Sequence, residues 1–241
     1  MKTSNKLLVI LLINLVLIPT TIMLALSAKV NSGKYVLGMT EMEKEARAAK
    51  PISNTGLLKL TAPIGTKLEC TIHYSDSVYY RKYGSANERL SVENSGDTLV
   101  FSLPSSTDAS KDEDRNEIYL DLFMPFNGLL MLDGATAKLD SVAADAEIEV
   151  AMQNNSILTL GNRERDKNTP LKFASLFVQA NNSDLTIPDR TSIEKLVLKL
   201  DGQSKLAFGQ ELQFANLEGT ISGETSVNGP AKWFYLLKPT P

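Results

Sequence analysis

The sequence is poor in the side chains on which metal and nucleophile chemistry depends. Its 241 residues include one cysteine, Cys70, and one histidine, His73. A single cysteine excludes an intrachain disulfide and a cysteine zinc cluster. The pattern Gly-x-Ser-x-Gly of a nucleophile elbow is also missing. The formal net charge is -3 and no long basic run occurs, so the sequence lacks the electrostatic pattern of a nucleic-acid binder.

An uncharged apolar run does occur, at residues 7–28. Its length of about 22 residues is enough for a helix to cross a bilayer. The alternative is a cleaved signal peptide, with Ala25-Leu26-Ser27 as the cleavage site. Because the run is longer than the usual signal-peptide core of about 7–15 residues, an uncleaved transmembrane anchor is favoured.

The flanking charges predict the orientation of this segment. Lys2 and Lys6 precede the apolar run, which places the N-terminus inside by the positive-inside rule. The remaining domain is then extracytoplasmic, in the periplasm or at the cell surface, on a single-pass protein of the cell membrane. Residues 29–50 are interpreted as a juxtamembrane linker, because their last ten residues, EMEKEARAAK, are highly charged.

Residues 51–237 have the pattern of an all-β domain. Apolar and polar residues alternate in runs such as DTLVFSLP and EIYLDLFMP, and turn residues separate the runs. The polar, charged segment 105–117 is predicted to be an exposed loop between two strands.

The second half of this domain repeats itself. Three segments align on Ser156, Ser183 and Ser204. Alternating apolar positions precede each serine: Ile148, Val150 and Met152; Leu176, Val178 and Ala180; Leu196, Leu198 and Leu200. Others follow it: Leu158 and Leu160; Leu185 and Ile187; Leu206 and Phe208. LDGATAKL is interpreted as an earlier copy with one extra residue before Leu139, and ANLEGTISGETSV as a shorter final copy.

The repeat length of about 20–27 residues is typical of solenoid coils. One such unit has a single apolar stripe that it cannot bury alone, whereas stacked coils bury a continuous column and pair their strands in parallel. The prediction is therefore a single-stranded β-helix, or β-solenoid, preceded by one transmembrane helix. An antiparallel sandwich with similar hairpins is the open alternative.

The chain also resembles a known family, the head domain of auto-transporter adhesins called the GIN domain. The resemblance rests on EIYLDLFMPFNGLLMLDGATAKL and LVLKLDGQSKLAF, in which Pro125, Gly134-Ala135-Thr136 and Gly202-Gln203-Ser204 match the family's pattern. It covers about residues 51–237. It departs from the pattern where Asn-Asn-Ser replaces a glycine corner, and the string Gly-Ile-Asn does not occur. It implies an envelope protein with surface binding, and no catalytic residues.

Two sets of residues could carry chemistry. Strand alternation puts Cys70 and His73 on opposite faces, so they cannot form a simple pair. Acids at the corners of neighbouring coils could act together in glycoside hydrolysis, namely Asp133, Asp184, Asp201 and Glu218. Asp-Gly is also a local turn-former, and this structural role is favoured for Asp133, Asp201 and Glu218. Calcium binding by the same acids has no dense ligand loop to support it.

The remaining motifs have structural interpretations. The Asn-Asn-Ser strings at 154–156 and 181–183 fit the glycosylation pattern, but their shared repeat position favours corners. Trp233, Phe234 and Tyr235 are predicted to cover the last coil.

The function predicted is a non-catalytic, adhesin-like envelope module that is held in the membrane by its N-terminal helix. The partner would be an envelope protein or a glycan, not nucleic acid. The sequence predicts no catalytic, cofactor-binding or metal-ligating residue and no cofactor. The alternative is a carbohydrate-active solenoid, a hydrolase or lyase, that uses corner carboxylates.

Overall fold

The computed structural model describes residues 15, 17–24, 27, 48–83, 89–105, 117–143, 145–161 and 171–239. The chain divides into two compact units, residues 1–45 and 46–241. In the first unit, residues 17–24 are helical. None of the helices among the described residues has the length and apolar character needed to span a membrane. Most of the predicted anchor (7–28), linker (29–50) and charged loop (105–117) lies outside the described residues.

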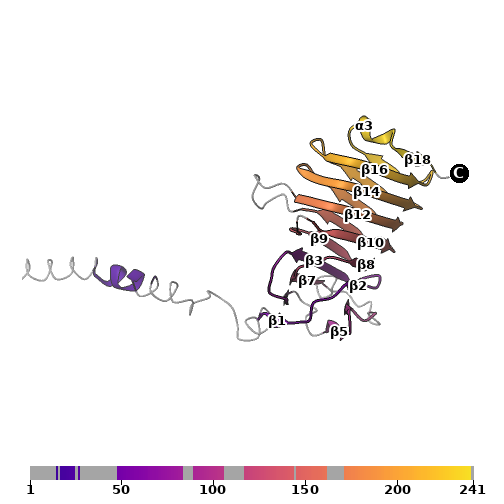
Figure 1. Ribbon diagram of the computed structural model, residues 1–241. Coiled ribbons are helices and arrows are strands. Elements are labelled where there is room, and N and C mark those ends of the chain that lie inside the picture. Colours follow the sequence, from indigo (N-terminus) through magenta and orange to yellow (C-terminus); the bar gives the residue numbers. More distant parts are fainter. Residues whose placement is uncertain are drawn as a thin grey trace, which may run out of the picture. The chain divides into compact units, whose positions relative to one another are not determined.

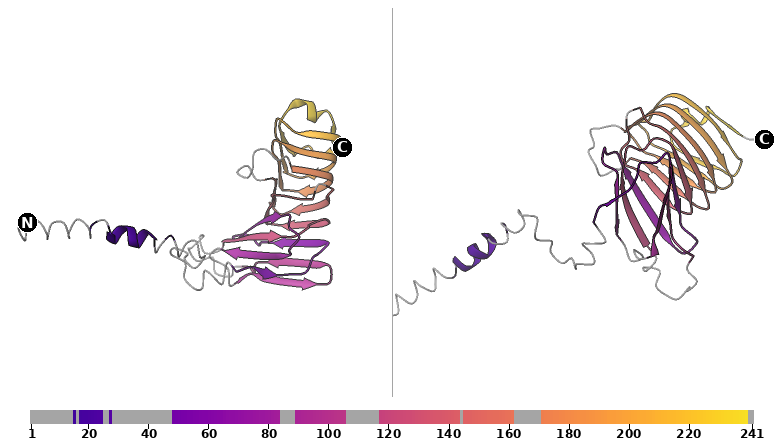
Figure 2. Two further views of the ribbon diagram at one scale, coloured as in Figure 1. Left: turned by 60° about the vertical axis from the view of Figure 1, so that its left-hand side comes forward. Right: turned by 60° about the horizontal axis from the view of Figure 1, so that its bottom comes forward.

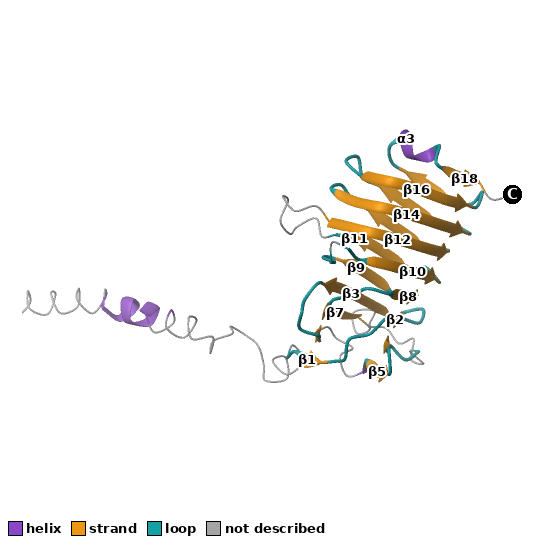
Figure 3. Cartoon of the chain, in the orientation of Figure 1, coloured by secondary structure: helices purple, strands orange, loops and turns teal. Residues whose placement is uncertain are grey.

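The second unit is mostly β, as predicted, and forms two nine-stranded mixed sheets (Figures 1 and 3). Sheet A has the order β1 (Lys50–Pro51), β4 (Tyr79–Tyr83), β7 (Glu117–Phe123), β3 (Lys67–His73), β9 (Thr136–Leu139), β11 (Ile157–Leu160), β13 (Asp184–Ile187), β15 (Lys205–Phe208) and β17 (Ser226–Asn228). Sheet B has the order β18 (Leu237–Pro239), β16 (Gln213–Ile221), β14 (Thr191–Asp201), β12 (Leu171–Asn181), β10 (Glu147–Gln153), β8 (Leu129–Asp133), β2 (Leu57–Thr61), β6 (Thr98–Ser102) and β5 (Ser91–Ser95).

From β8 onward the chain alternates between the sheets, and each strand pairs in parallel with the equivalent strand of the next repeat (Figure 2). Val178 lies between Val150 and Leu198 in sheet B. Leu185 lies between Leu158 and Leu206 in sheet A. The predicted alignment on the three serines is thereby confirmed residue by residue, and the antiparallel sandwich is wrong for these repeats.

Two details of the repeat alignment are wrong. Leu139 pairs with Leu160, and Asp133 pairs with Gln153. The corner at Gly134-Ala135 is therefore one residue shorter than the next corner, at residues 154–156, and no residue is added before Leu139. In the final repeat Gly219 pairs with Leu198, inside β16. Glu218-Gly219 is thus mid-strand, and the corner falls later, at residues 222–225.

The first strands of the two sheets in chain order do not lie at the sheet edges. β2 lies between β6 and β8, and β3 lies between β7 and β9, so the later strands β6 and β7 lie outside β2 and β3. Antiparallel strands β5 and β4 then border β6 and β7, and β1 pairs with β4. The edge strands at this end are therefore β5 in sheet B and β1, of two residues, in sheet A, and a very short edge strand offers few unpaired backbone groups to another chain.

The core is a column of inward-facing aliphatic and aromatic side chains between the sheets. Alternation is regular: in β7, β8 and β10 every second residue is buried. The core also contains three serines: Ser156, Ser183 and Ser204. Each hydroxyl donates a hydrogen bond to a backbone carbonyl of its own corner, that of Gln153, Asn181 or Asp201. The serines therefore let the chain turn inward without leaving a polar atom unpaired.

The aromatic residues near the C-terminus divide between two roles. Trp233, in the short helix α3 (Ala231–Phe234), packs against the core with its ring centroid 4.9 Å from that of Phe214. Phe234 and Tyr235 are 38% and 87% exposed. The predicted end cap is confirmed for Trp233 and wrong for Tyr235.

Candidate functional site

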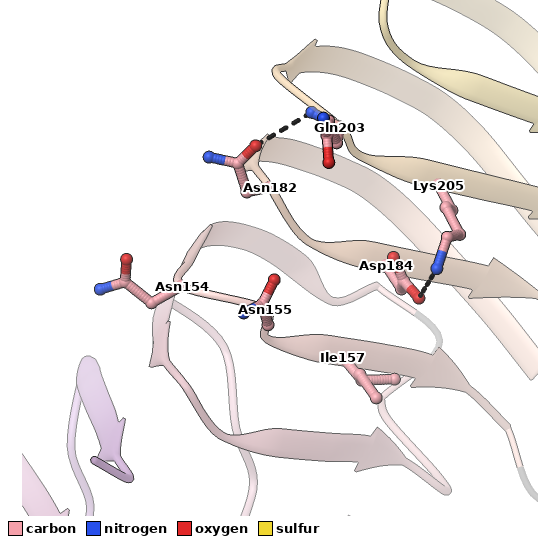
Figure 4. Close-up of a pocket in the computed structure, with 7 residues that line it drawn as sticks. All are labelled: Asn154, Asn155, Ile157, Asn182, Asp184, Gln203 and Lys205. Atoms are coloured by element: carbon pink, nitrogen blue, oxygen red, sulfur yellow. Dashed lines mark hydrogen bonds and ion pairs between the residues drawn. The ribbon is translucent and has the colours of Figure 1, made fainter. Parts of the chain in front are cut away.

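A polar groove of about 490 Å³ follows the corners that join sheet B to sheet A (Figure 4). It is lined by Asn154, Asn155, Ile157, Asn182, Asp184, Gln203 and Lys205. All three of these asparagines have positive φ, of 58°, 60° and 49°. Asparagine tolerates this left-handed conformation better than most residues. The corner role predicted for the Asn-Asn-Ser strings is confirmed, and Asn154, Asn155 and Asn182 line one groove.

The groove combines amides with one ion pair. The Asn182 Oδ1 accepts a hydrogen bond of 2.9 Å from the backbone N–H of Gln203. The Lys205 Nζ lies 3.4 Å from the Asp184 carboxylate. Ile157 is 40% exposed. Amides both donate and accept hydrogen bonds, so this surface suits a neutral ligand rich in hydroxyl or amide groups.

The structure does not assemble the corner acids into a pair. Asp133 and Asp201 share one row of sheet B but are three strands apart, about 14 Å at the usual strand spacing. Residue 222 is level with Asp201 on the neighbouring strand, and Glu218 lies four residues, about 13 Å, before it. The Asp184 carboxylate forms an ion pair with Lys205. Glycoside hydrolysis needs two carboxyl groups separated by about 5–9.5 Å.

Cys70 and His73 lie on opposite faces of β3, as predicted. Cys70 is fully buried, and burial raises the pKa of its thiol well above the usual range. The thiol therefore stays neutral and has the character of a small core side chain.

His73 belongs to a cluster that the sequence did not indicate. Its Nδ1 lies 2.8 Å from the Asp140 carboxylate and its Nε2 lies 3.7 Å from that of Asp121. Its ring stacks on Phe123 at 4.7 Å, and Phe123 stacks on Tyr79 at 4.6 Å. These residues come from β3, β7, β4 and the segment after β9, and the pairing of β3 with both β7 and β9, and of β7 with β4, brings them together.

This arrangement stabilises a charged imidazole. The nearby Asp121 carboxylate contributes most to raising the pKa of His73, and Asp140, which makes the shorter contact, raises it further. The proximity of His73 in turn lowers the pKa of Asp121. Both ring nitrogens face carboxylates, so the chemistry favours a structural imidazolium over a base that activates a hydroxyl nucleophile.

Stability should therefore depend on pH through His73. Because its pKa is raised in the folded state, its contribution is fully present below the unfolded value of about 6.5 and is lost as pH rises through the folded pKa. We expect urea midpoints of the native chain to fall above pH 6.5 more steeply than those of His73→Gln. Identical profiles for the two proteins would contradict this account.

The Asp-Gly corner at 201–202 permits a direct test of its structural role. Asp201→Asn keeps the turn chemistry, and we expect the unfolding free energy to change by no more than about 0.5 kcal/mol. Gly202 has φ of +62°, and an added Cβ would lie 2.3 Å from the Asn182 Oδ1. Gly202→Val should therefore cost about 1–3 kcal/mol in urea unfolding. A larger loss for Asp201→Asn would refute the structural assignment.

The described part of the chain contains no candidate metal site. Its residues include no group of three or more histidine, cysteine, aspartate or glutamate side chains that could hold an ion.

Comparison with known proteins gives structural similarity only. No family model matches the chain, and no curated protein sequence matches it. A crystal structure of a "putative adhesin" from Parabacteroides merdae is similar with a TM-score of 0.47 and 8% identity, covering 76% of this chain and 79% of that one. A "putative cell adhesion protein" from Clostridium sporogenes has a TM-score of 0.34 and 11% identity, covering 80% and 99%. Both neighbours carry adhesion names, but identities this low and TM-scores below 0.5 assign neither a fold nor a role to this chain.

Proposed function

We propose that this protein is a non-catalytic, adhesin-like envelope module that binds through the outside of a two-sheeted β-solenoid. The observation that carries the proposal is the strand register, which keeps Asp133, Asp201 and Glu218 far apart. An amide-lined groove at the corners offers a binding surface whose one carboxylate, that of Asp184, is paired with Lys205. The ligand class suited to such a groove is a glycan or an extended polar segment of an envelope protein.

The solenoid class is supported by the alternation of the chain between two parallel ladders from β8 to β17. Each coil contributes one strand to each sheet and pairs with the coil before and after it. The proposed membership in the GIN-domain family rests on the sequence resemblance around Pro125, Gly134 and Gly202.

The proposed location is the cell membrane, with the β domain on the extracytoplasmic side. Support comes from the uncharged run at residues 7–28 and from Lys2 and Lys6 before it. Alkaline carbonate washing of membranes tests this proposal. The full-length chain should remain in the pellet, whereas release of a shortened, soluble chain would show cleavage and contradict the anchor.

A binding and hydrolysis screen tests the proposed activity. The full chain, purified in mild detergent, would be applied to a glycan array and incubated with the same polysaccharides. We expect no cleavage, and we expect any glycan binding to weaken in Asn182→Ala but not in Thr186→Ala, a control in β13 that does not line the groove. Polysaccharide cleavage that disappears in Asp201→Asn or Asp133→Asn would contradict the proposal and favour a carbohydrate-active enzyme.

A further inference from the structure

The corners that join sheet B to sheet A differ in length. Equivalent positions bound three neighbouring corners: Gln153, Asn181 and Asp201 precede them, and Ile157, Asp184 and Lys205 follow them. The middle corner, 182–183, therefore has two residues, whereas the corners on either side of it, 154–156 and 202–204, have three. The middle corner takes the shorter path between the sheets, which leaves a recess between its two neighbours.

This recess is the amide-lined groove (Figure 4). Asn155 and Gln203 line it from the two longer corners, and Asn182 lines it from the shorter one. The longer corners are two strand spacings apart, about 9.6 Å, so the groove has the width that one further strand would fill. Its volume of about 490 Å³ is within the range of small-molecule sites. The groove therefore admits one extended chain at a time, running across the corner.

The other two-residue corner in this row, at residues 134–135, is bridged by a side chain. Asn154 reaches over from the longer corner beside it, and its Nδ2 donates a hydrogen bond of 2.7 Å to the Asp133 carboxylate. Asn154 thus spends its amide on the protein itself, and the corner at 182–183 is the one that offers open amides.

The amides of the groove stand on a fixed backbone and keep free hydrogen-bonding groups. The Asn155 N–H donates to the Asn182 carbonyl at 2.8 Å, and the Asn182 N–H donates to the Asp201 carbonyl at 3.2 Å. Asn182 uses its Oδ1 to accept from the Gln203 N–H, which leaves its Nδ2 available. Among the residues that the structure describes, the side chains of Asn155 and Gln203 have no hydrogen-bond partner. These groups are therefore preorganised for a ligand.

The charges of the lining balance. Asp184 and Lys205 are its charged side chains, one acid and one base, and they lie 3.4 Å apart as an ion pair. A charged ligand would lose hydration in this groove without meeting an excess of opposite charge. The lining therefore favours a neutral ligand.

An extended polypeptide would find little to bind here. A peptide that joins a sheet needs unpaired backbone groups and pockets for alternate side chains. The N–H groups of Asp184 and Lys205 already donate to the neighbouring coils, to the carbonyls of Ser156 and Ser183. Ile157, which is 40% exposed, is the one apolar residue of the lining. A sugar chain needs neither feature, because its hydroxyl groups can bond directly to side-chain amides.

We propose that the groove holds one chain of a neutral, linear glycan; this inference deepens the binding role proposed above and rests on it. The amides of Asn155, Asn182 and Gln203 bond the hydroxyl groups, and Ile157 contacts the C–H groups of a sugar ring. The two-residue corner forms the floor of the groove. Binding therefore depends on the length of this corner as well as on its side chains.

Calorimetric titration of the full chain, in a detergent whose headgroup is not a sugar, tests this inference. The probes are cellohexaose, mannohexaose and chitohexaose, with hexagalacturonate as the acidic comparison. At least one neutral probe should bind, and it should bind more tightly than hexagalacturonate. Asn182→Gly removes the amide and keeps the positive φ, so it should weaken binding about three- to tenfold, the effect of one hydrogen bond.

A glycine inserted after Asn182 tests the shape of the groove. The insertion gives this corner three residues, like its neighbours, and should abolish measurable binding. A glycine inserted after Gly223, in a turn where no atom lies within 4 Å of an added Cβ, is its control. Arg190→Gly is the control for Asn182→Gly, because Arg190 also has positive φ, of 62°, but does not line the groove. Neither control should change the affinity.

The outcomes separate this inference from the proposed function. Thermal melts would show which variants fold, and Asn182→Gly decides the result if the insertion prevents folding. Binding of a neutral probe that Asn182→Gly leaves unchanged would overturn the groove as the site but keep the adhesin-like role. Binding of hexagalacturonate alone, of an envelope protein alone, or of none of the probes would overturn the neutral-glycan inference. Cleavage of a probe would contradict the non-catalytic function on which this inference rests.

Discussion

Gly134→Val should cost more than about 4 kcal/mol of unfolding free energy and should prevent stable folding at 37 °C. Gly134 has φ of +68°, which a β-branched residue adopts only with strain. An added Cβ would also lie 2.2 Å from the backbone oxygen of Ala62, at the end of β2. Backbone cannot rotate away as a side chain can, so β8 would have to separate from β2. Urea unfolding of the full chain, followed by circular dichroism, measures the effect.

Gly65→Val is the matched control for this prediction. Gly65 has φ of +83°, but no atom lies within 4 Å of an added Cβ. Its substitution should therefore cost only the backbone strain of about 1–3 kcal/mol. Equal losses for the two variants would show that the close approach of β8 to β2 contributes nothing, and would contradict the placement of β2 beside β8.

The second large effect is expected in the core. Leu198→Ala should destabilise the domain by about 2–5 kcal/mol, because Leu198 is 1% exposed and lies between the buried Val178 and the chain at Gly219. Lys199→Ala, one residue later on the outer face, should change stability by no more than about 0.5 kcal/mol. Urea midpoints of the two variants compare the faces directly, and similar losses would contradict the assignment of Leu198 to the inside.

The repeating part of the fold could be read from the sequence because its contacts are periodic. Leu196, Leu198 and Leu200 recur at the same distance before a serine as their partners in the preceding repeat, and stacking pairs equivalent positions. Burial of that serine follows from the same periodicity. Local alternation thus predicts both the strands and their register wherever successive repeats pair with each other.

The first part of the fold could not be predicted in this way. β2 and β3 pair with strands on either side that come much later in the chain, and no repeat links them. The His73 cluster depends on this arrangement, since Asp121 and Phe123 reach His73 only through the pairing of β3 with β7. The groove was missed for a different reason. Its asparagines were correctly assigned to corners, but the sequence did not show that the corner amides line one surface.

The acids illustrate how a difference of four residues in register alters a functional interpretation. Glu218-Gly219 resembles Asp201-Gly202 in sequence, yet Gly219 pairs with Leu198 in mid-strand. The resemblance of the dipeptides suggested acids stacked at corners, and the pairing places Glu218 on the flat face of sheet B. With that correction, the carboxylates implied by the enzyme alternative are no longer aligned along one corner.

Disulfide cross-linking across β12 and β14 tests the central claim, the parallel register of the repeats, most directly. Gln179 and Lys199 are paired on the outer face, and the strand spacing of about 4.8 Å lies within the range of a disulfide. Gln179→Cys with Lys199→Cys should oxidise readily, while Gln179→Cys with Lys195→Cys, about 13 Å farther along the strand, should not. Cross-linking of the 179–195 pair in preference to the 179–199 pair would contradict the account.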